Sequence, residues 1–448
     1  MSTEAAFRVD PKTEMFWNDF AANAADLPGA GLAWLDGRRV AAIEAFASGG
    51  MPTRRMEAWK YTDLAGALEA ELEAATPFRA TPIEIGALAD PFAAVRPSRV
   101  ALVDGYLHYI GGTALPEEID VVDLAQLSAR TPGWVEEHLG IGAAAADQPL
   151  GAASLALMRG GVAIRVRAGA KIATPLHLHV INPERGRSVM THARVLLVLE
   201  EGASLTLLES HVGEGGGQML ANLGTELVLG VNAKLTHIRL QAEAPNSLHV
   251  TSVGATLARD AQYRALFAHL GAKMSRVDMN VRLTAPGADA AIRSVTVLGR
   301  EAHADMTTVI DHAAPHTKSR QLFKSVLGGR ARSVSQGRVT VREGAVKSDS
   351  HQLFKALLLG PRAEADAKPE LEIYADDVVC GHGTAIGALD MDALFYLRSR
   401  GVPEGEARGL LVRAFLEDAL EGFAEPAIHA ALWAAIDAAL SDVNGGAI

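Results

Sequence analysis

The fold of this chain is decided by a short repeated pattern, seen as Val-Arg-Ala-Gly-Ala at Val166–Ala170 and as Leu-Glu-Glu-Gly-Ala at Leu199–Ala203. In each copy an aliphatic residue is followed four positions later by alanine, with a small, polar or charged residue just before that alanine. Glycine or asparagine at that position is typical of positive φ, so the pattern predicts a tight corner with the alanine packed inside it. Further copies end at Ala233, Ala261, Ala302, Ala331, Ala345 and Ala363, and a copy stretched by one residue ends at Ala288.

The spacing of these corners predicts a repetitive β-structure. Successive alanines lie mostly 28 to 30 residues apart, or about half of that. The segments between them alternate apolar and polar residues with a period of two, as at Val162–Arg167 and Leu176–Val180, and no segment suits a helical crossover. A β-sandwich built from hairpins is the ordinary alternative. The corner keeps its four-residue frame in eight of nine copies, which favours a parallel β-helix or β-solenoid.

The composition narrows the class of protein. The 448 residues include one cysteine, 49% hydrophobic residues and 21% charged residues, with a formal net charge of −11. One thiol excludes an internal disulfide and a Cys-rich metal site built from this chain alone. The acidic balance argues against partners such as nucleic acid or an anionic membrane. No signal-like N-terminus and no long apolar run stand out, so a soluble, cytoplasmic protein is expected.

Changes of periodicity along the chain predict three regions. Residues 1–145 are expected to form a mostly helical N-terminal domain and residues 150–385 the parallel β-helix core. Residues 386–448 are expected to form a C-terminal helical domain, because the apolar spacing changes to a period of 3.6. Its predicted helices cover Asp392–Arg398, Glu404–Leu420 and Pro426–Leu440. The predicted fold class is therefore mainly β, with a parallel β-helix core flanked by helical domains.

Cys380 and His382 form the main candidate site for chemistry. They are two positions apart, so their side chains share one face of an extended segment. A thiolate and an imidazole on one face make up half of a site for a soft metal. Asp376, Asp377 and Asp390 are close enough in sequence to add oxygen ligands. The alternative is that Cys380 simply packs, as free cysteines often do.

Histidines form a second group of candidates. Several of the 15 alternate along predicted strands and would stack on neighbouring coils, either as a metal-binding ladder or, as we favour, as a solvated or hydrogen-bonded face. His312 and His316 flank a proline in a loop-like segment and are a secondary pair. The strand histidines are His177, His179, His192, His211, His237 and His249.

Three stretches resemble the SufD branch of the SufB/SufD family of iron–sulfur cluster assembly scaffold proteins. They are Arg54–Thr62 (Arg-Arg-Met-Glu-Ala-Trp-Lys-Tyr-Thr), Lys368–Gly383, which ends in Val-Val-Cys-Gly-His-Gly, and Leu394–Gly401 (Leu-Phe-Tyr-Leu-Arg-Ser-Arg-Gly). The resemblance implies a non-enzymatic subunit with a right-handed parallel β-helix between two helical regions. It also implies pairing with a SufB-like paralogue through the β-helix, docking of a SufC-like ABC ATPase on the C-terminal helices, and a homodimer when the subunit is isolated.

For the site, the resemblance implies that His382 lies at the interface between the two paralogues, where a nascent cluster forms, with Cys380 as its neighbour. An iron–sulfur cluster takes about four ligands, mostly thiolates, so a chain with one thiol must share a transient cluster with its partner chain. No cofactor is expected to be tightly bound to this chain alone. The glycine-rich segment Gly213–Gly217 is not followed by Lys-Ser or Lys-Thr, so any ATP is hydrolysed by a partner.

Two departures from the family pattern are visible. Gly381 stands where the family commonly has serine. Phe354 and Ala356 occupy asparagine positions, so an inner asparagine ladder is not expected here, although the fold still is. Two other functions stay open: a carbohydrate-active β-helix enzyme using Asp376 and Asp377, and a structural or metal-storage homodimer. The enzyme is disfavoured because aromatic residues, which stack on sugars, make up 5% of the chain.

Overall fold

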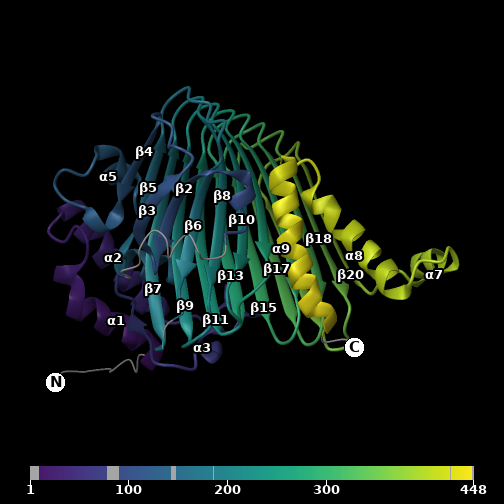
Figure 1. Ribbon diagram of the computed structural model, residues 1–448. Coiled ribbons are helices and arrows are strands. Elements are labelled where there is room, and N and C mark those ends of the chain that lie inside the picture. Colours follow the sequence, from purple (N-terminus) through teal and green to yellow (C-terminus); the bar gives the residue numbers. More distant parts are fainter. Residues whose placement is uncertain (1–9, 78–89, 143–147, 185, 424, 446–448) are drawn as a thin grey trace, which may run out of the picture.

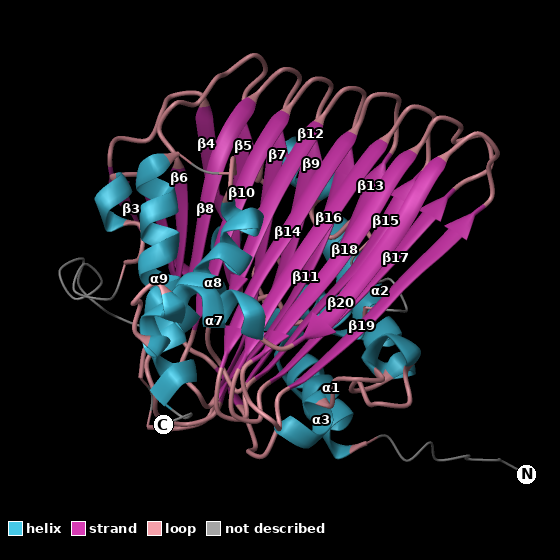
Figure 2. Cartoon of the chain, turned by 90° about the vertical axis from the view of Figure 1, so that its right-hand side faces the viewer, coloured by secondary structure: helices cyan, strands magenta, loops and turns pink. Residues whose placement is uncertain are grey.

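Each coil of the chain contributes one strand to each of two parallel β-sheets in the computed structural model, which describes residues 10–77, 90–142, 148–184, 186–423 and 425–445 (Figures 1 and 2). Sheet A contains β4 (Ile119–Asp123), β5 (Gly160–Val166), β7 (Val189–Leu199), β9 (Met219–Leu229), β11 (Ser247–Leu257), β13 (Met274–Leu283), β15 (His303–His312), β17 (Arg332–Val341) and β19 (Glu364–Ile373), with β1 (Glu73–Ala74) beside β7. Sheet B contains β3 (Tyr106–Gly112), β2 (Ser98–Val103), β6 (Leu176–Asn182), β8 (Ser204–Gly213), β10 (Lys234–Ala242), β12 (Gln262–His269), β14 (Asp289–Leu298), β16 (Lys318–Leu327), β18 (Asp349–Leu358) and β20 (Val379–Gly387).

The strand pairing confirms the predicted β-solenoid and contradicts the hairpin sandwich. Strands that follow each other from β5 to β20 lie in opposite sheets, and each pairs in parallel with the strand two places along the chain. Antiparallel pairing is confined, in the described sheets, to β2–β3 and β4–β5 at the N-terminal end. Residues of β2, β3 and β4 thus already belong to the two sheets, while the domain limits drawn from the sequence stay predictions.

The corners have the geometry that their sequence predicts. In every copy the alanine N–H donates to the carbonyl three residues earlier, as in Ala203 to Glu200 at 3.0 Å and Ala331 to Gly328 at 3.0 Å. Gly202 has a φ of 67° and Asn232 a φ of 56°, so in these copies a left-handed residue stands just before the alanine, whereas before Ala331 the left-handed residue is Gly329, one position earlier. The Ala203 side chain is fully buried. Because each corner also bonds to the next one, the corners stack with the strands.

Apolar side chains fill the space between the sheets. Alternate residues of each strand point inward, so that Leu197 and Leu227 of sheet A face Leu207 and Leu235 of sheet B in one buried cluster. Burying a leucine contributes about 1.5–3 kcal/mol, and the cluster runs through most coils. This core, and not the helices, holds the two sheets together.

Helices of the N-terminal region cover the outer face of sheet A. Leu150 and Leu155 pack with Leu196, Leu220 and Leu248, which point away from the solenoid core. The short helix at Leu64–Ala67 is followed by an extended segment whose strand β1 pairs with β7. These helices are α1 (Pro11–Asn23), α2 (Ala33–Gly49), α3 (Leu64–Ala67), α5 (Gly133–His138) and α6 (Pro149–Ala156), with short 3₁₀ turns at Ala24–Asp26, Glu57–Trp59, Ala93–Val95 and Leu124–Gln126.

The C-terminal helices cover the outer face of sheet B, and all three predicted helices are present. They are α7 (Met391–Ser399), α8 (Glu404–Leu420) and α9 (Pro426–Gly445). Leu416 of α8 and Ile436 of α9 pack in one cluster with Leu240 and Val295 of the sheet, while α7 extends beyond the last coil (Figure 1). No helix within the described ranges is long and apolar enough to cross a membrane.

Candidate functional site

The last coil leaves both sheets with an open edge. β19 ends sheet A and β20 ends sheet B, and no described strand pairs with their outer sides. Their side chains are far more exposed than those of the central strands. Unpaired strand edges present free N–H and C=O groups and readily accept another strand. The end of the solenoid is therefore a ready docking surface.

Cys380 and His382 lie on this edge strand and share its inward face, as their spacing predicts. Cys380 is in register with Ser350, and His382 with Gln352, so the two extend polar rows of the interior to the edge. Cys380 is half-buried and His382 is exposed. Burial raises the pKa of the Cys380 thiol, Asp349 adds to this, and a backbone hydrogen bond with Ser350 only partly opposes it. The thiol is thus protonated at neutral pH in the isolated chain.

The interior rows behind this pair differ from an asparagine ladder, in line with the sequence. Phe354 stacks on Phe323 with ring centroids 4.8 Å apart and planes 7° from parallel. Gln352 is in register with Gln321 of the previous coil. Two residues earlier on the same strands, Ser319 and Ser350 are bonded through their hydroxyls at 2.7 Å. The phenyl stack keeps the coil spacing without any amide ladder.

The acidic candidates have structural roles instead of joining Cys380 and His382. Asp377 stands in a corner with a φ of 56° and pairs with Lys347 at 2.5 Å. Asp390 caps α7, where its carboxylate accepts from the N–H groups of Asp392 and Ala393. A salt-bridged corner residue and a helix cap are poor candidates for acid–base catalysis.

Apolar side chains surround the open edge. Tyr374 is 64% exposed and Val379 is 62% exposed, at the ends of the two edge strands. Ile373 and Ile386 add further exposed apolar surface. Beyond them, α7 exposes Met391, Phe395 and Tyr396. Contiguous exposed apolar surface of this kind marks an interaction site in a protein that is otherwise well packed.

The N-terminal motif Arg54–Thr62 has a structural role on the outer face of sheet A. Trp59 is buried there, and the guanidinium of Arg276 lies 3.9 Å from its ring centroid. The Ala58 carbonyl accepts from Arg276 at 2.8 Å, and the Thr62 hydroxyl donates to Asp305. The motif therefore fastens the N-terminal region to the solenoid.

The sequence predicts a solvated or hydrogen-bonded face for the strand histidines; they are buried, most of them are hydrogen-bonded, and they do not form one ladder. His192 lies on the outer face of sheet A, where burial lowers its pKa to about 3. His312 bonds Thr317 and Ser319 inside the solenoid, whereas His316 forms a corner with a φ of 57°. The remaining strand histidines divide between an outer group and an interior group.

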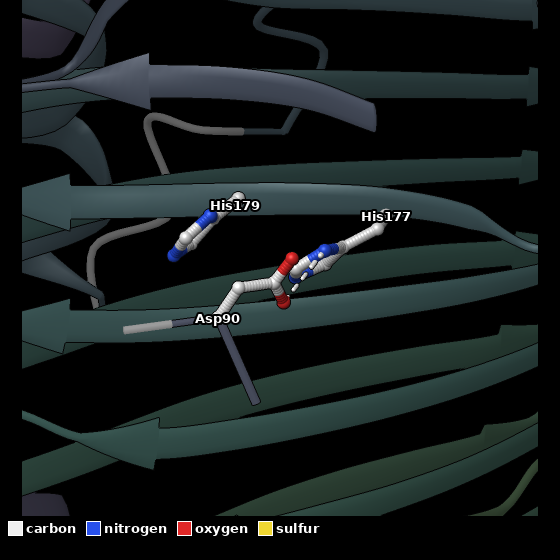
Figure 3. A group of neighbouring side chains, drawn as sticks. All are labelled: Asp90, His177 and His179. Carbon is white, nitrogen blue, oxygen red and sulfur yellow. Dashed lines mark ion pairs between the residues drawn. The ribbon is translucent and has the colours of Figure 1, made fainter. Parts of the chain in front are cut away.

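The outer group joins His177 and His179 of β6 to Asp90 (Figure 3). The two imidazoles stack with ring centroids 5.0 Å apart, and His177 Nδ1 lies 3.5 Å from Asp90 Oδ1. Burial, the neighbouring His179 and Arg99 lower the pKa of His177 well below its usual value. Arg99 also pairs directly with the Asp90 carboxylate. Because this guanidinium already neutralises the carboxylate, the group is a weak candidate for a cation.

The interior group gathers His211, His237 and His249 around two buried carboxylates, Glu209 and Glu243. Glu209 contacts His211 and accepts from His237 Nε2 at 2.7 Å, and Glu243 lies 2.7 Å from His249 Nδ1. Sequence reasoning did not group these acids with the histidines. The register of β8 and β10 brings these acids to the histidines. Gln241 pairs with His211, and Glu243 is two residues further along the chain.

The chain thus has the architecture of a scaffold-type β-helix protein. Its two-sheet parallel solenoid is covered by helices and ends in an open edge that carries a thiol and an imidazole. Residues 179–415 match the family described as "SUF system FeS cluster assembly, SufBD core domain", and residues 12–178 match "SufBD protein N-terminal region". The chain therefore belongs to the SufBD family of iron–sulfur cluster assembly proteins.

Individual relatives agree with this. The chain is 30% identical to the iron–sulfur cluster assembly protein SufD of Escherichia coli over 377 residues, which cover 83% of this chain and 85% of that protein. It is 28% identical to an iron–sulfur cluster assembly SufBD family protein of Synechocystis sp. over 397 residues, 86% of each chain. A SufBD family protein of Mycobacterium leprae is 31% identical over 313 residues, 68% of this chain and 78% of the relative.

Proposed function

We propose that this chain is a non-enzymatic scaffold subunit whose open edge pairs with a SufB-like paralogue, so that a nascent iron–sulfur cluster forms between them. The observation that carries the proposal is the position of Cys380 and His382 on β20, the edge strand of sheet B. Pairing through the edges of β19 and β20 would satisfy their free backbone groups and bury Tyr374 and Val379.

The cluster is a substrate of this scaffold and is shared between the chains. His382 supplies one ligand and Cys380 a second, and the remaining ligands come from the partner because this chain has no other thiol. The raised pKa of Cys380 supports the need for a partner, since iron must displace the thiol proton. In the isolated chain, the same edge pairs two copies as a homodimer.

The C-terminal helices are the docking surface for a SufC-like ABC ATPase. Phe395 on α7 is 73% exposed, and Tyr396 lies beside it. Helix α7 follows β20 in the chain, so its exposed apolar side chains are close to the edge where the cluster is built (Figure 1). The chain has no phosphate-binding loop of its own, so the energy of ATP is supplied by that partner, in the cytoplasm.

Replacing His382 by alanine in the reconstituted complex tests the ligand role. We expect the cluster yield, followed by visible absorption and by iron and sulfide content, to fall at least tenfold while the complex still assembles. His351→Ala is the matched control, because His351 lies on the adjacent strand β18 and is half exposed on the outward face. An unchanged yield in His382→Ala would refute the ligand role.

Replacing Val379 by aspartate tests edge pairing. A carboxylate within an apolar interface is desolvated without a partner, so complex formation in size-exclusion chromatography should be lost. Ile110→Asp is the control, because Ile110 is 45% exposed and lies on β3, at the opposite end of sheet B from β20. Retention of the complex by Val379→Asp, or equal loss in both variants, would contradict pairing at this edge.

A further inference from the structure

His211, Glu243 and His249 meet inside the solenoid, away from the open edge. His211 comes from β8, Glu243 follows β10 directly, and His249 belongs to β11 in the opposite sheet. One nitrogen of each imidazole and one oxygen of the carboxylate lie within 4.8 Å of one another. All three residues are at least 95% buried. The chain thus brings two imidazoles and a carboxylate together where it passes from sheet B to sheet A.

The protonation state of these groups suits a metal ion. Burial and the neighbouring Arg239 lower the pKa of His211 to about 4, so its imidazole is neutral and keeps a free lone pair. Burial alone would raise the pKa of Glu243, but His249, His211 and Gln241 together lower it to about 2, so it is ionised. Among the described residues, His211 Nδ1 and Gln241 Oε1 have no hydrogen-bond partner.

We propose that His211, Glu243 and His249 bind a divalent transition-metal ion in the interior of the solenoid. Two imidazoles and one carboxylate are the donor set of non-haem Fe²⁺ sites and of many Zn²⁺ sites. Ligand atoms that lie about 2.1 Å from a tetrahedral ion are about 3.4 Å from one another. Side-chain rotations that move the ligand atoms by about 1 Å therefore bring them to this separation. The site is separate from the edge site and does not depend on it.

Neighbouring side chains are arranged as a supporting shell. Glu209 contacts His211 through Nε2, which fixes the imidazole and directs metal binding to the other nitrogen. Asn182 donates to Glu243 Oε1 at 3.0 Å, and Gln241 donates to Glu243 Oε2 at 3.1 Å. The unpartnered Gln241 Oε1 is a further oxygen donor. Carboxylates and amides that orient metal ligands are found at most protein metal sites.

The net charge of the interior group also favours a cation. Glu209 and Glu243 carry two negative charges, and Arg239 carries one positive charge. The group therefore has one carboxylate more than it has guanidinium groups, and such an excess of negative charge is costly in a buried setting. A divalent ion beside Glu243 compensates this negative charge and coordinates the carboxylate directly. The ion and the carboxylates therefore stabilise each other.

A surface cavity borders the corner of Glu243. It has a volume of about 690 Å³ and is lined by Glu243 and Pro245 of the corner after β10, by Lys273, and by Ala435 and Ala439 of α9. His211 and His249 do not line this cavity, so we expect an ion to reach the buried group through a shift of the corner. Metal exchange is therefore expected to be slow compared with exchange at a surface site.

Titration of the full-length chain with Co²⁺ tests the proposal. The chain is first stripped with chelator, and a Cys380→Ser/His382→Ala double variant is used so that the edge contributes nothing. We expect about one Co²⁺ per chain, with a visible absorption spectrum typical of nitrogen and oxygen ligands and slow release to chelator. Absence of Co²⁺ binding in this background would overturn the proposal, whatever the result of the cluster assay.

Single variants locate the ion. In the same background, His211→Gln is expected to weaken Co²⁺ binding at least tenfold, while His192→Gln, at an equally buried histidine outside the interior, should leave binding unchanged. Equal effects of both variants would refute the assignment. If His211→Gln does not fold, anomalous diffraction from wild-type crystals soaked in Co²⁺ decides, because a peak bound to anything other than His211, Glu243 and His249 would overturn the proposal.

Discussion

Arg276 and Arg239 are both fully buried, but their surroundings differ. On the outer face of sheet A, every guanidinium nitrogen of Arg276 is bonded, to Asp278, Asp305 or the Ala58 carbonyl. Inside the solenoid, Nη2 of Arg239 contacts Thr251 and His249, and its Nε lies 3.5 Å from a carboxylate oxygen of Glu209, but Nε and Nη1 have no hydrogen-bond partner among the described residues. Burial alone would lower both pKa values. The carboxylates beside Arg276 raise its pKa instead, whereas that of Arg239 stays lowered.

The Arg276 cluster is a structural connection, whereas the interior cluster around Arg239 is a site whose polar groups are not all bonded. Buried polar groups are normally fully bonded, so the Arg276 cluster is complete as it stands and joins the N-terminal motif to the sheet. The interior cluster keeps unused donors and acceptors next to two carboxylates. Unused capacity in a buried group calls for an explanation, and a bound ion supplies one. Four predictions test this contrast.

The largest effect is expected from Arg276→Ala. This change leaves Asp305 buried without its main partner and removes the cation above Trp59, so the free energy of unfolding should fall by about 3–5 kcal/mol in urea denaturation. Arg282→Ala, on the same strand but largely exposed, should change it by less than about 0.5 kcal/mol. A loss below about 1 kcal/mol for Arg276→Ala would show that the cluster is not a fastening.

The second effect concerns the interior cluster. Co²⁺ at a hundred times its dissociation constant should raise the free energy of unfolding by about 2.7 kcal/mol if it binds the folded chain alone. The same gain is expected in Thr62→Val, which touches only the outer cluster. In His211→Gln, whose affinity should be at least tenfold lower, the gain should be at most about 1.4 kcal/mol at the same Co²⁺ concentration. Thermal or urea unfolding with and without Co²⁺ measures this, and an undiminished gain in His211→Gln would assign the ion elsewhere.

Acidification is expected to weaken the outer face through His192. Burial and the charge of Arg159 lower its pKa to about 3, against about 6.5 in the unfolded chain. Between these values the unfolded chain binds the extra proton, so stability falls as the pH falls below 6.5 and is unaffected above it. The slope is at most about 1.4 kcal/mol per pH unit. Unfolding at pH 6.5 and 5.5 should show a smaller loss in His192→Gln; equal losses would refute the assignment.

The smallest effect is expected from Thr62→Val. The hydroxyl is lost, but Asp305 keeps its contact with Arg276 and a hydrogen bond from Thr307 at 2.8 Å. The loss should therefore be about 1 kcal/mol. Thr384→Val, at an exposed position of β20, provides the reference, with a change near zero. A loss as large as that of Arg276→Ala would mean that Thr62, and not the arginine, organises the cluster.

Much of the fold follows from local rules that the sequence displays. The corner alanines, the residue of positive φ before them and the period-two alternation each depend on a few adjacent residues, and all are present in the structure. The helices at Glu404–Leu420 and Pro426–Leu440 also begin and end close to the predicted positions. The pairing of β1 with β7 could not be predicted in this way, because its two strands are more than a hundred residues apart in the chain.

The candidate sites were only partly predictable for the same reason. Cys380 and His382 share a face because they are two apart in an extended strand. Glu243 and His249 approach His211 through the register of neighbouring coils and across the interior, which no local pattern reveals. Whether the predicted solvated or hydrogen-bonded face of histidines is buried could not be decided, because alternation identifies two faces of a strand but does not show that helices cover the outer one.

The number of stacked corners also sets the length of the molecule. Because neighbouring coils lie about 4.8 Å apart, the number of corner repeats fixes how far the edge strands stand from the helices of the N-terminal region. Joining Leu229 directly to Ala258 would recreate a complete corner ending at Ala261, with one coil fewer. Evolution can therefore change the reach of this protein in whole steps, while the edge that carries Cys380 and His382 keeps its shape.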